Sequence, residues 1–163
     1  MKSKLNTFLI ALFCVLFAHA NELTIKDLCS GVYAARGIHG VTPLLDGETY
    51  SQLSANRKQI VRYSFKTGEQ VGVLFDVNDT KGATRLAHID GYQMSPNEAN
   101  ILIQTETKRI YRHSSTAQYY IYNVKNRTLA PLSEGGPQEV PLWSRDGNMV
   151  GFVREGNLFI VKL

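Results

Sequence analysis

The 163-residue sequence is poor in cysteine, with Cys14 and Cys29 as its two thiols. Cys14 lies in a predicted signal peptide, so the mature chain would keep Cys29 alone and could not depend on an internal disulfide. Long Lys/Arg runs are also lacking, which argues against nucleic acid as a partner. Removal of Lys2 and Lys4 with that peptide leaves 16 basic against 14 acidic residues. The precursor pI of about 9.1 therefore overstates the basic character of the mature chain.

Sequence motifs for catalysis are lacking as well. The chain contains neither a Gly-x-Ser-x-Gly nucleophile elbow nor a glycine-rich phosphate loop. Ser114 and Ser115 follow His113, but a triad needs three groups brought together with an oxyanion hole, and adjacent positions do not build one. His39 and His88 have no Cys, Asp or Glu at metal-ligand spacing, so neither a metal nor a cofactor is predicted. The chain alone is therefore predicted to be inactive.

The first twenty residues read as a secretory signal peptide. Lys2 and Lys4 give a short basic start, residues 9–17 are an unbroken apolar run, and residues 18–20 (Ala-His-Ala) fit a small–x–small cleavage site. The apolar run is too short to span a bilayer comfortably. We expect residues 1–20 to be removed and the protein to be secreted or periplasmic. The alternative is that the segment is retained as a membrane anchor.

After a lead-in segment, residues 21–40, the chain reads as short strands. In the lead-in, Thr24 with Asp27 three residues later predicts a capped short helix. From residue 41 onward, runs rich in β-branched and aromatic residues are bounded by Gly, Pro and Asn, which is typical of strands. The candidate strands are 41–45, 49–53, 59–65, 70–75, 101–103, 119–124, 129–132, 149–153 and 157–161.

These strands fall into three units, residues 41–76, 91–132 and 137–163. Ser95 and Ser144 begin similar turns 49 residues apart, each before an apolar strand, whereas the first unit shows no serine turn. A repeat of about 40–50 residues with four short strands is typical of a β-propeller. We therefore predict an all-β fold, a partial β-propeller of about two and a half four-stranded antiparallel blades. The alternative is a β-sandwich with two accidental turn matches.

A propeller usually closes with about 4–8 blades. Two complete units and part of a third would leave one blade face and a strand edge exposed, which is an aggregation liability. We therefore expect the chain to be a fragment of a longer protein. The weaker alternative is that partners supply the missing blades.

Residues in the second and third units resemble a known family. They are Tyr111-Arg112-His113-Ser114, Thr116-Ala117, Tyr119 to Tyr122, Ser95-Pro96, Trp143-Ser144 with Asp146-Gly147, and Asn157-Leu158-Phe159. This set resembles the first part of the propeller domain of dipeptidyl peptidase IV, a serine exopeptidase of the prolyl oligopeptidase superfamily. The similarity runs from about Leu23 to the end. It departs at Arg145, where the turn usually carries proline, and at Asn97-Glu98, where the family has Asp-Gly.

The resemblance implies a secreted enzyme that removes Xaa-Pro or Xaa-Ala dipeptides from peptides with a free N-terminus. In that family the propeller caps a C-terminal α/β-hydrolase domain, which holds the Ser-Asp-His triad and would be missing from this chain. Arg112 matches the arginine that approaches the substrate backbone carbonyl. The glutamate pair that holds the substrate amine would follow Leu163. The relatives pair as homodimers, so a homodimer of the full-length protein is a further expectation.

From the residues alone, Arg112 has a second interpretation. A guanidinium is a fixed fork of five donors suited to carbonyls and carboxylates, but an arginine at a rim can also pair with Glu106 or a backbone carbonyl. His113 can be read as a base or ligand, or as a hydrogen-bonded structural residue. For the whole protein, the alternative function is a non-enzymatic exported β-propeller binding module.

Overall fold

The computed structural model describes residues 23–35, 37, 40–81 and 83–163. The chain divides into two compact units between residues 38 and 39. The predicted signal peptide, residues 1–20, lies outside the described residues. Among the residues that are described, no helix is long and apolar enough to cross a bilayer.

The first unit contains a short capped helix, α2 (Ile25–Cys29). The Thr24 hydroxyl accepts a hydrogen bond from the Asp27 amide at 3.1 Å, and the Asp27 carboxylate accepts one from the Thr24 amide at 3.3 Å. This reciprocal pair is a capping box, which satisfies two amides that the helix itself leaves without partners. The helix predicted from Thr24 and Asp27 is confirmed.

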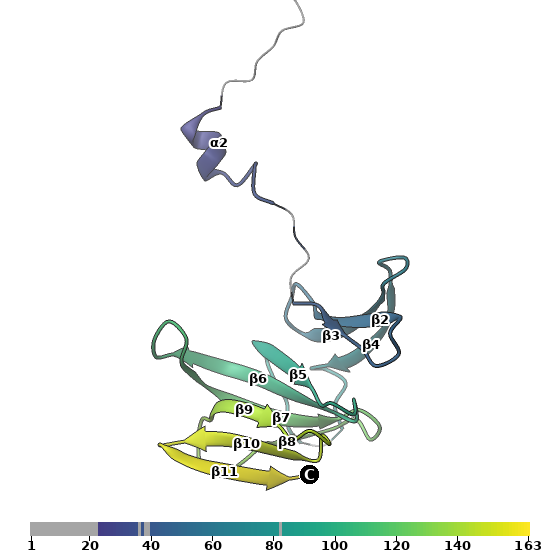
Figure 1. Cartoon of the computed structure of the whole chain (residues 1–163), viewed down its shortest axis with the longest axis vertical. Helices are drawn as coiled ribbons and strands as arrows, with labels where there is room; N and C mark the ends of the chain where they lie inside the picture. The colour runs from purple at the N-terminus through teal and green to yellow at the C-terminus, as the bar shows by residue number, and fades with distance from the viewer. Residues whose placement is uncertain (1–22, 36, 38–39, 82) are drawn as a thin grey trace, which may run out of the picture. The chain divides into compact units, whose positions relative to one another are not determined.

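The second unit consists of three antiparallel sheets in which consecutive strands are neighbours (Figure 1). The first sheet contains β1 (Thr42–Pro43), β2 (Thr49–Leu53), β3 (Gln59–Ser64) and β4 (Gln70–Asp76). The second contains β5 (Gly91–Met94), β6 (Asn100–Arg109), β7 (Ser115–Asn123) and β8 (Thr128–Pro131). The third contains β9 (Glu139–Trp143), β10 (Met149–Arg154) and β11 (Asn157–Lys162).

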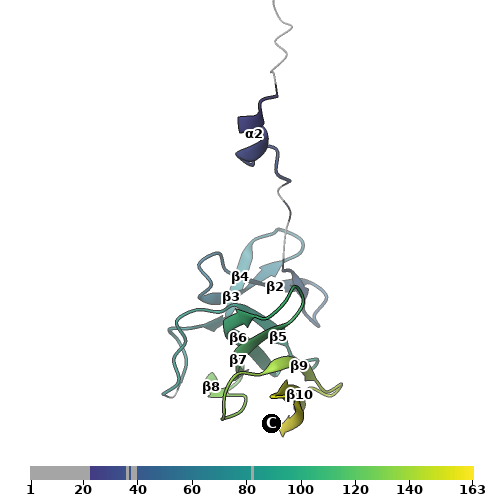
Figure 2. The same cartoon turned by 90° about the vertical axis from the view of Figure 1, so that its left-hand side faces the viewer.

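The second sheet is covered on both faces, as both views show (Figures 1 and 2). Side chains alternate between the faces of a strand, so Ile101 and Ile103 of β6 point toward the first sheet while Leu102 points toward the third. The core between the first and second sheets contains Ile60, Phe75, Val77, Ile89, Ile101, Ile103, Tyr122 and Leu129. The core between the second and third contains Leu102, Ala117, Tyr119, Leu132, Val150 and Phe152.

This double coverage excludes the two-layer sandwich. In a sandwich the apolar strands at 101–103 and 149–153 would face each other across one core, whereas here they belong to successive sheets. The tyrosines of β7 alternate in the same way, since Tyr119 packs toward the third sheet and Tyr122 toward the first. Burial raises the pKa of both hydroxyls above their ordinary value.

The third sheet is more complete than the sequence suggested. It has three strands instead of half a blade, because residues 139–143, which were not among the predicted strands, form β9. This strand was not predicted because it contains Pro141. Proline has no backbone N–H to donate to the strand ladder, so its presence argues against a central strand. Among the strands of this sheet β9 pairs with β10 alone, and an edge position tolerates proline.

The serine turns repeat in atomic detail. The Ser95 hydroxyl donates to Asn97 Oδ1 at 2.7 Å, and the Ser144 hydroxyl donates to Asp146 Oδ1 at 2.6 Å. Each hydroxyl also accepts from the backbone amide five residues later, at 2.9 Å in both turns. These bonds occupy polar groups that would otherwise compete with the strand ladder, so each turn fixes where the following strand begins.

The prediction that the first unit lacks a serine turn is wrong. Ser54 donates to Asn56 Oδ1 at 2.7 Å and accepts from the Gln59 amide at 2.9 Å, the same pattern as at Ser95. This turn joins β2 to β3, one hairpin later than in the other sheets. The β1–β2 turn has Asp46 instead, whose carboxylate accepts from the Thr49 amide at 2.9 Å.

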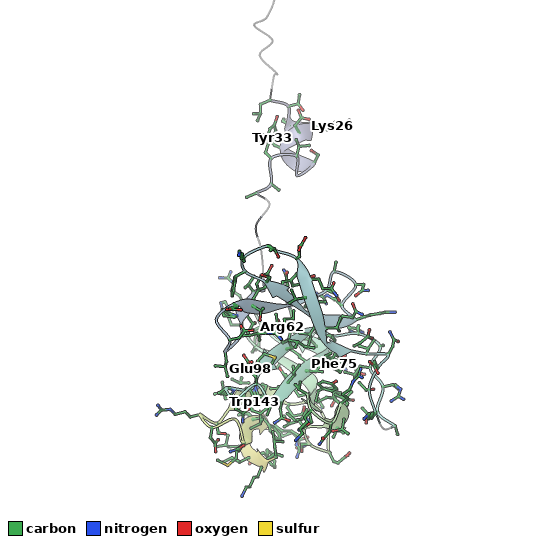
Figure 3. The ribbon with its side chains drawn as sticks, turned by 90° about the vertical axis from the view of Figure 1, so that its right-hand side faces the viewer. Lys26, Tyr33, Arg62, Phe75, Glu98 and Trp143 are labelled. Atoms are coloured by element: carbon green, nitrogen blue, oxygen red, sulfur yellow. The ribbon has the colours of Figure 1, made fainter. Side chains whose placement is uncertain are left out.

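The turns that join the first two strands of each sheet contact one another. We call this set the turn row: residues 44–49, 95–100 and 144–149. Glu98 Oε1 accepts from the Leu45 amide at 2.5 Å, and Asn97 Nδ2 donates to the Asp146 carbonyl at 3.0 Å. Figure 3 shows Glu98 between Arg62 of the first sheet and Trp143 of the third. The turn row thus links all three sheets at one end.

Candidate substrate-binding site

The residue predicted to contact substrate lies at the tip of a long hairpin. β6 and β7 continue beyond the apolar core, and their last pair is Arg109 with Ser115. The Ile110 amide then donates to the Ser114 carbonyl at 2.9 Å and closes the hairpin. β6 thus extends well beyond the predicted strand 101–103 (Figure 1). Arg112 lies in the loop at the end of the hairpin.

A β-bulge interrupts this hairpin at its base. Thr105 pairs with Gln118 and Lys108 with Thr116, so β6 has one more residue between these pairs than β7. Glu106, one of the two residues of β6 that lie opposite Ala117, has a left-handed backbone with φ of +53°. A bulge bends its strand and redirects the side chains that follow. The direction of the Arg112 loop therefore depends on this bulge.

On its β7 side the hairpin base is joined to the segment that leads into the third sheet. Ala117 and Gln138 exchange backbone hydrogen bonds of 3.0 and 2.8 Å. The Gln138 side chain is fully buried; it accepts from the Tyr119 amide at 3.0 Å and donates to the Gly136 carbonyl at 2.7 Å. With its polar atoms paired, Gln138 fixes β7 against its neighbour without the cost of a buried unsatisfied group.

Arg112 itself is exposed and lines a surface pocket of about 250 Å³. The other lining residues are Thr107, Arg109, Tyr111, His113, Ser114 and Ser115. Within the described chain, the ion pairs involve Arg57, Arg62, His88 and Arg127 as the basic partners. The pairing of Arg112 with Glu106, one of the alternatives from sequence, is therefore not present. The guanidinium is left available for a carbonyl or carboxylate from outside the chain.

The residues around Arg112 offer binding groups and no catalytic set. His113 is exposed, and within the described part of the chain its side chain makes no hydrogen bond, so the structural role considered for it is not seen. Ser114 and Ser115 follow it at the start of β7. Among residues 23–35, 37, 40–81 and 83–163 no group of three His, Cys, Asp or Glu side chains could hold a metal ion. The exposed guanidinium can donate hydrogen bonds to a carbonyl or a carboxylate.

A second hollow, of about 480 Å³, lies between the first and second sheets. It is lined by Gln59, Val73, Leu74, Phe75, Asp76, Asp79, Tyr122, Val124 and Arg127. Its charged groups are paired within the chain, since Arg127 forms an ion pair with Asp79. Burial alone would raise the pKa of Asp76, but the hydrogen bonds from Gln59 and Asn78 outweigh it, and the pKa lies below its ordinary value. These contacts account for the polar lining without a ligand.

One residue that contacts the hairpin base, Asp90, was not predicted from the sequence. Asp90, the last residue of the segment between β4 and β5, accepts a hydrogen bond from the Thr107 amide at 2.9 Å. Its position directly before Gly91, the first residue of β5, was the available signal. That signal is weak, because aspartate before glycine is common in turns of every kind.

Comparisons with known proteins agree with this arrangement. Residues 95–163 match the model of the dipeptidyl peptidase IV (DPP IV) N-terminal region. The chain is 38% identical over 72 residues to a probable dipeptidyl-aminopeptidase B of Aspergillus niger, a match covering 42% of this chain and 8% of that protein. It is 24% identical over 139 residues to human prolyl endopeptidase FAP, covering 85% and 17%. The crystal structure of Porphyromonas gingivalis dipeptidyl peptidase 4 matches with a TM-score of 0.75 and 36% identity, covering 88% of this chain and 20% of that one.

The fold is thus all-β, with successive antiparallel sheets arranged as in part of a β-propeller, as predicted. The chain resembles the N-terminal part of the dipeptidyl peptidase IV propeller region, and the resemblance seen in the sequence is confirmed. It spans a fifth or less of the length of these relatives.

Proposed function

We propose that this chain is the N-terminal propeller portion of a secreted dipeptidyl peptidase IV-like serine exopeptidase that removes Xaa-Pro or Xaa-Ala dipeptides. In this proposal Arg112 helps to orient the peptide, and an α/β-hydrolase domain outside the chain supplies the serine, aspartate and histidine. The observation that carries the proposal is the exposed Arg112 guanidinium, unpaired within the described chain, at the tip of a hairpin whose base is fixed. The hairpin lies inside the region that matches the family.

The chemistry of Arg112 suits this role. A guanidinium presents several N–H donors in one plane, so it can hold a peptide carbonyl in a defined direction. Holding the carbonyl aligns the scissile bond with a nucleophile, and such alignment lowers the barrier by removing motions that the substrate would otherwise have to lose. A peptide with a free N-terminus is therefore the proposed substrate. The dipeptidyl-aminopeptidase and dipeptidyl peptidase names of the relatives support it.

The direct test is Arg112→Ala in the longer enzyme. We expect kcat/KM for a glycyl-prolyl chromogenic substrate to fall at least tenfold, equivalent to about 1.4 kcal/mol. Arg145→Ala is the matched control, because it removes another exposed guanidinium, in the turn row instead of the hairpin. Its kcat/KM should stay within about twofold of wild type. An unchanged kcat/KM in Arg112→Ala would remove this arginine from the site.

A second test separates the enzyme from the alternative, an exported binding module without catalysis. The 163-residue chain alone should not hydrolyse the glycyl-prolyl substrate, whereas the longer protein should. Hydrolysis by the chain alone would show that catalysis does not need a further domain. Inactivity of both proteins toward the substrate would favour the binding module.

Export is a further part of the proposal. The basic start, apolar run and Ala18-His19-Ala20 site support cleavage after Ala20 and a secreted or periplasmic location. N-terminal sequencing of the mature protein should begin at Asn21, and Ala20→Arg should block this cleavage. A mature protein that still begins at Met1 would favour the retained anchor. Light scattering of the longer protein would test the proposed homodimer.

A further inference from the structure

Asp90 connects three elements at the base of the Arg112 hairpin. Its side chain is 17% exposed, and one oxygen, Oδ2, accepts from the Thr107 amide at 2.9 Å. The other oxygen, Oδ1, lies 3.2 Å from Arg57 Nη1 and 3.3 Å from His88 Nε2. The Asp90 amide donates to the Gln104 carbonyl at 2.7 Å, which fixes the backbone beside β6.

The Thr107 amide is the group that the bulge removes from the strand ladder. Thr107 lies between the pairs Thr105–Gln118 and Lys108–Thr116, where β6 has one residue too many to pair with β7. The opposite residue, Ala117, bonds to Gln138 instead. A partly buried amide without a partner costs free energy. The Asp90 carboxylate supplies that partner and so stabilises the bulge.

The Asp90 carboxylate is itself held in place from the first sheet. Arg57 comes from the turn between β2 and β3, and its carbonyl also accepts from the Ile89 amide at 2.8 Å. Gln104 Nε2 donates to Thr107 Oγ1 at 2.9 Å, so the threonine is fixed by its side chain as well as by its amide. Side chains from Asp90 and Gln104 thus both hold Thr107 at the bulge.

We propose that Asp90 is a positioning residue, which sets the direction of the Arg112 loop by holding the bulge at Glu106–Thr107. Asp90 acts through the hairpin and does not touch the substrate. Beyond the bulge the hairpin is held by its own backbone hydrogen bonds. A change in strand direction at the bulge therefore changes the position of the Arg112 loop at the tip. The effect on catalysis rests on the function proposed for Arg112, whereas the effect on the hairpin does not.

The structural part is tested by amide hydrogen exchange in the full-length protein. We expect Asp90→Ala to speed exchange of Thr107 and of the hairpin amides 109–114 at least fivefold, because the bulge amide loses its acceptor. Asp90→Asn keeps one acceptor oxygen and should restore most of the protection. Asp76→Ala is the control, since Asp76 also accepts a backbone amide (Asn78, 2.8 Å) and a side-chain amide (Gln59, 2.6 Å) away from the hairpin. Equal hairpin exchange in the Asp90 and Asp76 alanine variants would overturn the proposal.

The catalytic part is tested by a double-mutant cycle in the longer enzyme. Asp90→Ala should lower kcat/KM about fivefold when Arg112 is present, and less than about twofold when Arg112→Ala is already present. Asp90→Asn should recover most of the activity. An equal loss in the two backgrounds would show that Asp90 does not act through Arg112. If Arg112→Ala alone had no effect, the proposed function would fail, and hydrogen exchange would still decide whether Asp90 holds the hairpin.

Discussion

The two ends of β6 use polar side chains in opposite ways. At its start, in the turn row, Asn97 and Glu98 give their side-chain atoms to the backbone of neighbouring turns. At its far end, beyond the bulge, Arg112 and His113 are exposed and make no side-chain hydrogen bonds within the described residues. Bonds satisfied within the chain hold the sheets together, whereas unsatisfied donors on a fixed support are available to a ligand. We therefore expect changes in the turn row to alter stability and changes at the tip to alter recognition.

The largest effect on stability is expected from Gly147→Ala. Gly147 has a φ of +73°, which strains other residues, and an added Cβ would lie 2.8 Å from the Asn97 side chain. The free energy of unfolding, measured in urea, should fall by about 1–3 kcal/mol. Gly47→Ala isolates the backbone strain, because its φ is +69° with open space around it, and should cost less. Gly72→Ala, with neither feature, should be close to neutral; a loss as large as at Gly147 would contradict this explanation.

Removal of the Glu98 carboxylate is expected to have a smaller effect. Glu98→Ala leaves a non-glycine residue at the same positive φ but deletes the acceptor of the Leu45 amide. The free energy of unfolding should therefore fall by about 0.5–1.5 kcal/mol. Glu155→Ala is the matched control: Glu155 has a similar φ of +50° and is exposed. If both variants lost the same stability, the bond between the first and second sheets would contribute nothing.

Acid should weaken the turn row gradually. Hydrogen bonds from Ser144 and Asn148 lower the pKa of Asp146 below its ordinary value of 3.8. A carboxylate with a lowered folded-state pKa stabilises the fold above its unfolded pKa, and this contribution disappears as pH falls through the lowered value. The urea midpoint of Asp146→Asn should therefore lie below that of wild type at pH 7, and the two midpoints should converge at the acid end. A difference between the two midpoints that grew as the pH fell would contradict this prediction.

The smallest effect on stability is expected at the hairpin tip. Arg112→Ala removes an exposed side chain with no ion pair among the described residues, so unfolding free energy should change by less than about 0.5 kcal/mol. The same variant should lose at least tenfold in kcat/KM. A large loss of stability would mean that the tip supports the fold, and the contrast with the turn row would fail.

Patterns that are local in sequence predicted most of the strands. The Ile101–Ile103 run has the composition of a strand buried on both faces, and it became the centre of the second sheet. Ser95 and Ser144 marked the turns because their hydrogen bonds span only a few residues. The short capped helix followed from Thr24 and Asp27 for the same reason.

Features that depend on pairing between distant segments could not be predicted in this way. The Asp90–Thr107 bond spans 17 residues and exists because of a bulge, which only the register of β6 against β7 reveals. β9 was not predicted because a strand tolerates a proline such as Pro141 only at the edge of a sheet, and the edge position depends on the pairing of distant segments. Arg112 was identified by resemblance; its spacing alone did not separate a binding residue from a rim residue.

The double coverage of the second sheet has a consequence for denaturation. Loss of the first sheet would bare Ile101 and Ile103 to water, and loss of the third would bare Leu102, all of which are essentially inaccessible in the native state. Exposure of apolar surface to water is unfavourable. Unfolding of the first or the third sheet alone is therefore disfavoured. The middle strands should be the last to exchange their amides with solvent, and their neighbours should melt cooperatively with them.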